Sequence, residues 1–184
     1  MSKEITLMDE KEINRVLTRM AHQILERNKG VEGLALVGIR TGGVFLAQRL
    51  KGKIMHTEQA DVPMGILDIT LYRDDWSMIG RQPLVHKTEI GFPVEDQKII
   101  LVDDVLFTGR TIRAALDALM DFGRPKGVEL AVLVDRGHRE LPIEPQYVGK
   151  KINTAFSERV NVFLKEVGGE DKVILETGTG LEKR

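Results

Sequence analysis

The chain has 184 residues, 42% of them hydrophobic and 30% charged, which is typical of a globular protein, and its length suits one domain over 1–184. A formal net charge of −1 gives no overall attraction to nucleic acid, and the absence of cysteine excludes disulfides, thiolate metal sites and cysteine nucleophiles. The N-terminus lacks an apolar signal core, and no run approaches the ~18 apolar residues of a membrane span. We therefore expect a cytoplasmic protein with no membrane contact.

The first half of the chain predicts helices and strands in alternation. Asp9 and Glu12 form a capping-box pair, which predicts a helix that ends at Gly30. The apolar stripe of this helix consists of Ile13, Val16, Leu17, Met20 and Ile24. The apolar run 34–39 predicts a strand, and a second helix is expected over 44–50.

The alternation continues in the second half. A strand over 66–71 leads into a polar stretch, 72–86. The clearest buried strands are expected over 98–102 and 128–134, with a helix over 111–122 between them that is closed by Gly123 and Pro125. This pattern predicts an α/β fold with a mostly parallel twisted sheet flanked by helices.

Ligands of parallel sheets bind outside the carboxyl ends of the strands. The loops 40–43, 103–111 and 135–139 are therefore the candidate sites. In the middle loop, Asp103 and Asp104 follow an apolar strand, and Thr108-Gly109-Arg110-Thr111 lies at a helix N-terminus. Helix N–H groups, hydroxyls and a guanidinium suit a phosphate, while the acids suit a ribose diol and a Mg²⁺ carried by a diphosphate. The alternative is a pair of strand-end acids followed by an ordinary Thr-Gly turn.

Known nucleotide loops do not explain this segment. The chain has no Gly-x-x-x-x-Gly-Lys-Ser/Thr loop, and no Gly-x-Gly-x-x-Gly follows a strand. The segment instead resembles the 5-phosphoribosyl-1-pyrophosphate (PRPP) signature of type I phosphoribosyltransferases. The matching residues are Lys98, Ile99, Ile100, Leu101, Val102, Asp103, Asp104, Val105, Leu106, Phe107, Thr108, Gly109, Arg110 and Thr111.

Within that family, the chain resembles the bifunctional uracil phosphoribosyltransferases that also attenuate pyrimidine operons. The segments that carry this resemblance are 17–22, 26–30, 37–41, 68–75 and 133–142, in addition to the PRPP signature. The resemblance implies the type I phosphoribosyltransferase fold, with a flexible hood loop over about 72–86 that closes over PRPP. A solvated surface loop is the alternative for that stretch.

The resemblance also implies a reaction, in which uracil and PRPP give UMP and pyrophosphate with Mg²⁺. The paired acids Asp103 and Asp104 would contact the ribose and the metal, and Arg73 would reach the diphosphate. The uracil region would be Asp135, Arg136, Gly137 and His138. His138 is equally well interpreted as a turn residue, and none of the histidines has the spacing of metal ligands.

Arg40, Thr41, Gly42 and Gly43 match the family's pyrophosphate loop, which holds a non-proline cis peptide. This sequence departs from the family pattern, because Gly42 stands where relatives usually have arginine, although Arg40 could supply that cation. A simple glycine turn is the alternative.

Phe107 bears on the choice of base. Purine-salvage members of the family carry an acid at the matching position, where it manages a purine proton, whereas Phe107 is apolar. This favours uracil over hypoxanthine, unless Phe107 is simply a core residue.

The resemblance further implies binding to the mRNA leader of pyrimidine genes. The matching residues are Thr18, Arg19, His22, Arg27, Arg139 and Lys150. On the first helix these polar residues lie opposite the apolar stripe, so a solvated helix face is the alternative. Glu144 stands where relatives have arginine, which weakens this surface.

Other functions remain open. The chain could be an RNA-binding regulator whose enzyme site survives mainly as a sensor of UMP, or a phosphoribosyltransferase for a purine or orotate. The resemblance also implies a homodimer or a higher homo-oligomer.

Overall fold

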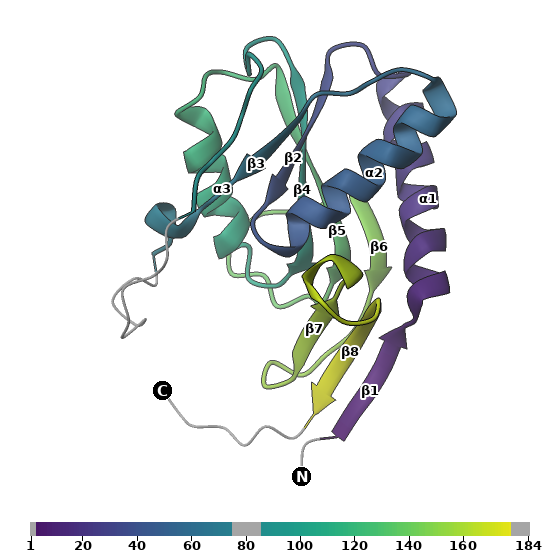
Figure 1. Ribbon diagram of the computed structural model, residues 1–184. Coiled ribbons are helices and arrows are strands. Elements are labelled where there is room, and N and C mark those ends of the chain that lie inside the picture. The colour runs from purple at the N-terminus through teal and green to yellow at the C-terminus, as the bar shows by residue number, and fades with distance from the viewer. Residues whose placement is uncertain (1–2, 75–85, 178–184) are drawn as a thin grey trace.

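The computed structural model describes residues 3–74 and 86–177, which form two sheets and their flanking helices (Figure 1). The larger sheet is parallel, with the strand order β3-β2-β4-β5-β6. Its strands are β2 (Leu34–Ile39), β3 (Met64–Leu67), β4 (Lys98–Leu106), β5 (Gly127–Asp135) and β6 (Tyr147–Lys151). The smaller sheet is antiparallel and has the order β1-β8-β7, with β1 (Lys3–Met8), β7 (Arg159–Phe163) and β8 (Lys172–Thr177).

Helices cover both faces of the parallel sheet. They are α1 (Glu10–Asn28), α2 (Gly42–Glu58) and α3 (Arg110–Met120). Successive residues of a strand point to opposite faces, so in β2 Leu34 and Leu36 pack with α1 and α2, whereas Ala35 and Val37 pack with α3. The predicted α/β fold with a mostly parallel sheet is confirmed.

Helix α1 begins as the capping box predicts. The Glu12 N–H donates to Asp9 Oδ1 at 2.8 Å, and the predicted apolar stripe is in the core apart from the half-buried Val16. The helix ends before Gly30, because Lys29 already adopts the left-handed conformation (φ 58°) and caps it. Helix α2 is longer than predicted, since it begins at Gly42 itself and continues to Glu58.

The strand predicted over 66–71 is wrong beyond Leu67. Asp68 turns the chain there, because its Oδ1 accepts from the Thr70 N–H at 2.8 Å and a 3₁₀ helix, Thr70–Tyr72, follows. Asp68 also accepts a hydrogen bond from the His86 N–H, across the stretch expected to form the hood. Of the hood prediction, residues 75–85 lie outside the described residues.

Strand β4 is longer than predicted and contains the acid pair. Asp103 pairs with Val132, and Val105 pairs with Val134, so the β4–β5 ladder continues four residues past Val102. Helix α3 starts at Arg110 and ends at Met120, close to the predicted 111–122.

The order of the strands creates a switch point between β2 and β4. From β2 the chain passes through α2 to β3 on one side, whereas β4 pairs with the other side of β2. Loops at the carboxyl ends of such neighbouring strands diverge and leave a crevice for a ligand. The loops after β2 and within 103–111 therefore meet at the position where a ligand is expected.

None of the helices within the described ranges has the length and hydropathy needed to cross a bilayer.

Candidate phosphoribosyl site

The loop after β2 packs directly against the acid pair of β4. A Cβ on Gly43 would lie 2.2 Å from the Val102 carbonyl oxygen, so only glycine lets α2 start this close to the strand. A Cβ on Gly42 would lie 2.5 Å from Asp104 Oδ2. The structure thus brings the predicted pyrophosphate loop and Asp104 together, and the Asp104 carboxylate fills the space that a side chain at position 42 would need.

The cis peptide that the family resemblance implied is present between Arg40 and Thr41. Arg40 Nη2 donates to the Lys87 carbonyl oxygen at 3.2 Å, and its buried Nε has no hydrogen-bond partner within the described residues. The role of Arg40 as the cation of this loop therefore stays a prediction.

The backbone of β4 holds the acid pair in place. Asp103 Oδ1 accepts from the Asp104 N–H at 2.9 Å, and Asp104 Oδ1 accepts from the Val105 N–H at 2.7 Å. Asp103 is buried, whereas Asp104 is half-buried. Burial and repulsion from the neighbouring Asp104 carboxylate raise the pKa of Asp103 well above its ordinary value. A cation or hydroxyl donors at this edge would relieve that repulsion.

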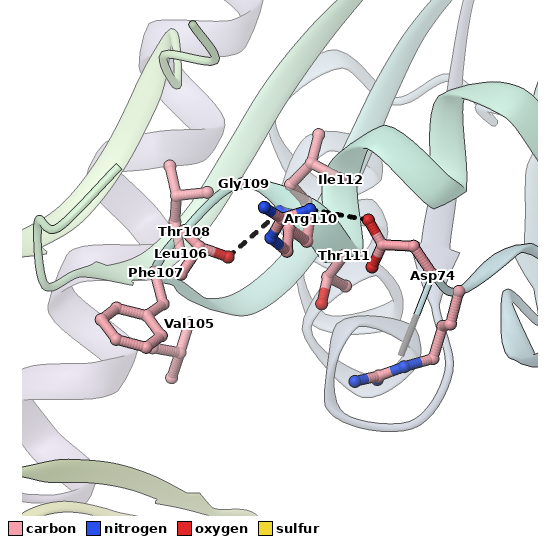
Figure 2. A pocket seen from close by; sticks show the side chains of 10 residues that line it. Asp74, Val105, Leu106, Phe107, Thr108, Gly109, Arg110, Thr111 and Ile112 are labelled. Carbon is pink, nitrogen blue, oxygen red and sulfur yellow. Dashed lines mark hydrogen bonds and ion pairs between the residues drawn. The ribbon is translucent and has the colours of Figure 1, made fainter. Parts of the chain in front are cut away.

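The turn between β4 and α3 forms an anion cradle. Gly109, in a left-handed conformation (φ 91°), precedes α3, and the first N–H groups of a helix have no acceptor within it. Of these, the Arg110 N–H donates to Thr108 Oγ1 at 3.3 Å. The cradle borders a cavity of about 210 Å³ (Figure 2). The cavity is lined by Arg73, Asp74, Val105, Leu106, Phe107, Thr108, Gly109, Arg110, Thr111 and Ile112.

The Arg110 guanidinium is held by carboxylates that the sequence did not single out. Arg110 Nη1 donates to Asp74 Oδ2 at 2.7 Å (Figure 2). Its Nε donates to Glu140 Oε2, also at 2.7 Å. Arg73, the predicted partner of the diphosphate, lines the same cavity. Helix α3 and the segment before residue 75 are thus joined at the site by an exposed ion-pair network.

The loop after β5 lies beside the cradle because Arg139 connects them. Its Nη2 donates to both carboxylate oxygens of Asp135 at 2.7 Å, and its Nη1 donates to the Phe107 carbonyl oxygen at 2.8 Å. Its Nε donates to the Ile143 carbonyl oxygen at 2.9 Å. Arg139, predicted as an RNA contact, therefore directs its donors inward and joins the predicted uracil region to the main chain at Phe107.

His138, expected equally as a turn residue or at the base, adopts the left-handed conformation (φ 64°), as does Gly137 (φ 75°). The His138 ring lies edge-on to Phe107, with centroids 5.8 Å apart. The predicted uracil region and the PRPP signature are thus neighbours.

The remaining predicted RNA residues lie apart from this site. Thr18, Arg19, His22 and Arg27 are on α1 (Glu10–Asn28), with His22, Arg19 and Arg27 exposed. Arg19 donates to the Val148 carbonyl oxygen at 3.3 Å, and Arg27 pairs with Glu129 at 3.1 Å.

Lys150 lies under the first turn of α1. Its Nζ donates to the Leu7 carbonyl oxygen at 2.8 Å and to Glu12 Oε1 at 2.9 Å, which leaves its side chain 35% exposed. The sequence missed Lys53 of α2, which donates to Asn14 and Thr18 of α1 and lines a groove between the helices. Helical spacing shows one helix face at a time, so a groove between helices gives no signal in the sequence.

Fold and site together define the class of protein. A family model described as the phosphoribosyl transferase domain matches residues 6–167. Among solved structures, hypoxanthine phosphoribosyltransferase from Staphylococcus aureus is 24% identical, with a TM-score of 0.64 over 83% of this chain and 80% of that one. The enzyme from Trypanosoma cruzi is 18% identical, with a TM-score of 0.69 over 92% and 94% of the two chains. At these identities the likeness concerns the fold alone.

Curated relatives narrow the class. Bifunctional protein PyrR from Deinococcus radiodurans is 58% identical over 92% of this chain and 93% of the relative. Bifunctional protein PyrR from Acetivibrio thermocellus is 59% identical over 92% of each. The chain belongs to the phosphoribosyl transferase family and, within it, to the bifunctional PyrR proteins.

Proposed function

We propose that this chain is a uracil phosphoribosyltransferase that converts uracil and PRPP to UMP and pyrophosphate. The observation that carries the proposal is the meeting of the acid pair and the anion cradle at the switch point between β2 and β4. Carboxylates beside a helix N-terminus match the hydroxyls and the 5-phosphate of a single ribose 5-phosphate. Membership among the PyrR proteins supports the same activity.

The geometry suggests a role for each part of the site. The cradle from Thr108 to Thr111 would bind the 5-phosphate, and Asp103 and Asp104 would accept hydrogen bonds from the ribose hydroxyls. The loop 40–43, with Arg73, would face the diphosphate. The bond from the ribose carbon to the diphosphate oxygen breaks, the bond to uracil N1 forms, and the N1 proton is lost. Positioning, and carboxylates near positive charge at the ribose carbon, would supply the catalysis.

The acid pair also fits Mg²⁺ carried by PRPP. Within the described residues, no group of three or more histidine, aspartate or glutamate side chains could hold a metal. Mg²⁺ commonly uses one or two carboxylates together with substrate phosphates, and Asp103 and Asp104 are the residues that would hold it. The bound ion supplies positive charge that stabilises the departing pyrophosphate.

The base is proposed to lie beside Phe107 and the loop 135–138. An apolar ring replaces the acid that purine-salvage enzymes carry at this position, and uracil needs no such acid for its own acidic N–H. Gly137 and His138 place main-chain groups next to the ring, where they could read the carbonyls and the N–H of uracil.

A second function, UMP-responsive attenuation through the mRNA leader of pyrimidine genes, is favoured by the exposed cations of α1. His22 and Lys53 of α2 line one groove, Arg19 lines the neighbouring hollow together with His22, and Arg27 is exposed further along α1, where it pairs with Glu129. Cations on one exposed face contact phosphates irrespective of the net charge of the chain. Since Arg139 bonds inward, we propose that it supports the base region instead of contacting RNA.

We also propose that the whole chain, 1–184, is one phosphoribosyltransferase domain that works in the cytoplasm as a homodimer or a higher homo-oligomer. Light scattering on the purified chain tests the assembly, and a single species with the mass of one chain would contradict it.

The enzyme proposal is tested by incubating the purified chain with PRPP, Mg²⁺ and each of uracil, hypoxanthine, guanine and orotate. We expect a strong preference for uracil, whereas faster turnover of a purine would refute the base assignment. A regulator with only vestigial activity predicts no turnover of any base together with intact binding of UMP.

A further inference from the structure

Three aromatic rings from separate loops meet at the carboxyl edge of the parallel sheet. Phe107 is the first residue after β4, His138 follows β5, and Phe156 lies between β6 and β7. The ring centroids are 5.2 Å apart for Phe107 and Phe156, 5.7 Å for His138 and Phe156, and 5.8 Å for Phe107 and His138. These are favourable edge-to-face or tilted distances, so the rings form one cluster next to the phosphate cradle.

The segment that carries Phe156 is firmly held. The buried Arg136 donates to Thr154 Oγ1 at 3.2 Å and to the carbonyl oxygens of Ala155 at 2.9 Å and Phe156 at 3.4 Å. His138 Nε2 lies 2.6 Å from the Thr154 carbonyl oxygen, which can only accept, so this nitrogen carries the proton. Arg136 and His138 of the predicted uracil region therefore hold the main chain of residues 154–156 in place.

The rings of Phe107 and Phe156 differ in how much of their surface is exposed. The Arg136 guanidinium lies 4.0 Å from the centre of the Phe107 ring and covers one face of it. Phe156 is 61% exposed even though the carbonyl oxygens of Thr154, Ala155 and Phe156 itself all accept hydrogen bonds. Hence the cluster presents a fixed, water-exposed aromatic surface beside the proposed position of the base.

We propose that Phe156 is a specificity-determining residue of the base site, whose exposed ring stacks on the nucleobase, and that Arg136 is the positioning residue that holds it there. The inference rests on the proposed phosphoribosyl transfer. An aromatic side chain binds a base through the face of its π-system, which every base also presents. Contact between the base and Phe156 would remove water from the face of the base and from the face of the ring that touch.

The experiment compares Phe156→Ala, Phe156→Leu and Phe156→Trp in the full chain. We expect Phe156→Ala to raise the KM for uracil by about 5- to 100-fold, the range for loss of one stacked ring, and to change the KM for PRPP by less than about twofold. Phe156→Trp should keep the KM for uracil near that of the unmodified chain, whereas Phe156→Leu should not. Phe122→Ala is the matched control, because Phe122 is 43% exposed just past the far end of α3.

Binding measurements separate this inference from the enzyme proposal. UMP and ribose 5-phosphate are titrated against the unmodified chain and Phe156→Ala by calorimetry, which requires no turnover. Weaker binding of UMP with unchanged binding of ribose 5-phosphate supports stacking, even if the chain transfers no uracil and the enzyme proposal fails. Equal affinities of both forms for UMP overturn the inference, as does a parallel loss of affinity for both ligands.

Discussion

The orientation of the acid pair depends on one oxygen atom of each carboxylate. Asp103 and Asp104 each use Oδ1 to accept the next backbone N–H, which leaves Oδ2 of each carboxylate without a backbone bond to its neighbour. Because the orientation is set by the strand, an amide of the same shape would fit the same position. Loss of charge can therefore be separated from loss of structure at these residues.

We predict that Asp103→Asn and Asp104→Asn each lower uracil phosphoribosyltransfer by at least ~10²-fold, because each removes charge from a positioned ribose and Mg²⁺ site. Steady-state kinetics and circular dichroism on each variant provide the measurement. Asp117→Asn is the control, since Asp117 is exposed on α3 and pairs with Arg113 one turn away on the same helix. Near-normal turnover in both folded variants would contradict the assignment of the active site.

The close contact of α2 with β4 depends on Gly43, which has no side chain. At Gly43, alanine would gain helix propensity worth about 1 kcal/mol, but its Cβ would lie 2.2 Å from the Val102 carbonyl oxygen. Overpacking against a backbone that cannot yield costs more, so we predict that Gly43→Ala lowers the free energy of unfolding by about 1–3 kcal/mol. Urea denaturation measures this.

Gly52→Ala provides the comparison on the same helix. Apart from its own helix backbone, no atom of the described residues lies within 4 Å of the added Cβ, so this change should stabilise the protein by about 0.5–1 kcal/mol. If Gly43→Ala were as stable as Gly52→Ala, the close approach of α2 to β4 would be wrong.

At the scale of elements, the sequence predicted those parts of the fold that long apolar runs determine. Strands β2 and β5 and helices α1 and α3 were found because their buried faces repeat with the helical or strand period over many residues. The smaller sheet was missed. Its strands β1 and β7 are short, β1 is mostly exposed and no residue of β7 is fully buried, so their side chains carry little hydrophobic signal.

The candidate site could likewise be predicted only where its residues differ clearly from the apolar strands around them. The loops after β2 and β4 were predicted because acids, glycines and hydroxyls stand out against apolar strands. The full length of β4 was not predicted, because carboxylates interrupt its apolar pattern although its backbone still pairs with β5. Partners from distant segments, such as Asp74 and Glu140 on Arg110 or Phe156 beside Phe107, become visible only when the chain is folded.

At the scale of the whole molecule, the two sheets are joined through Arg49 of α2. Its guanidinium donates to Asp171 and Glu166, at distances of 2.6–2.8 Å. Hydrogen bonds from Arg49 hold the pKa of both carboxyl groups below their ordinary values. A depressed folded-state pKa contributes stability above the unfolded-state pKa, and this stability is lost as the pH falls through the folded-state value.

We predict that Arg49→Met lowers the free energy of unfolding at pH 7 by roughly 1–3 kcal/mol, because it leaves a largely buried carboxylate, Asp171, without its partner. The difference from the unmodified chain should shrink as the pH falls below about 4, the ordinary carboxyl range, towards the depressed folded-state pKa values, where the two carboxyl groups lose their charge in the folded state as well. Urea midpoints at pH 7 and pH 3 measure it. Lys51→Met is the control, because Lys51 pairs with the exposed Asp61. A difference that stays constant with pH would contradict the ion-pair explanation.

The RNA surface involves the molecule as a whole, because its residues and the phosphoribosyl site lie on different elements. Arg19 and His22 are exposed on α1, whereas the ligand loops lie at the carboxyl ends of β2, β4 and β5. If α1 contacts RNA, Arg19→Gln and His22→Ala should weaken binding to a pyrimidine-operon leader and leave uracil turnover nearly intact. Each lost phosphate contact should also reduce the slope of log K against log salt by ~0.7–0.9. UMP should tighten binding only if it has a higher affinity for the RNA-competent state.

Gel-shift titrations at several salt concentrations, with and without UMP, measure these effects. Arg124→Gln is the matched control, since it also removes one exposed positive charge but follows α3, the helix on the opposite face of the sheet from α1. Equal weakening by Arg124→Gln and Arg19→Gln would mean that only overall charge matters. If the unmodified chain binds the leader no better than an unrelated RNA of equal length, the regulatory function is wrong and the enzyme proposal is unaffected, because its acid pair and cradle share no residue with α1.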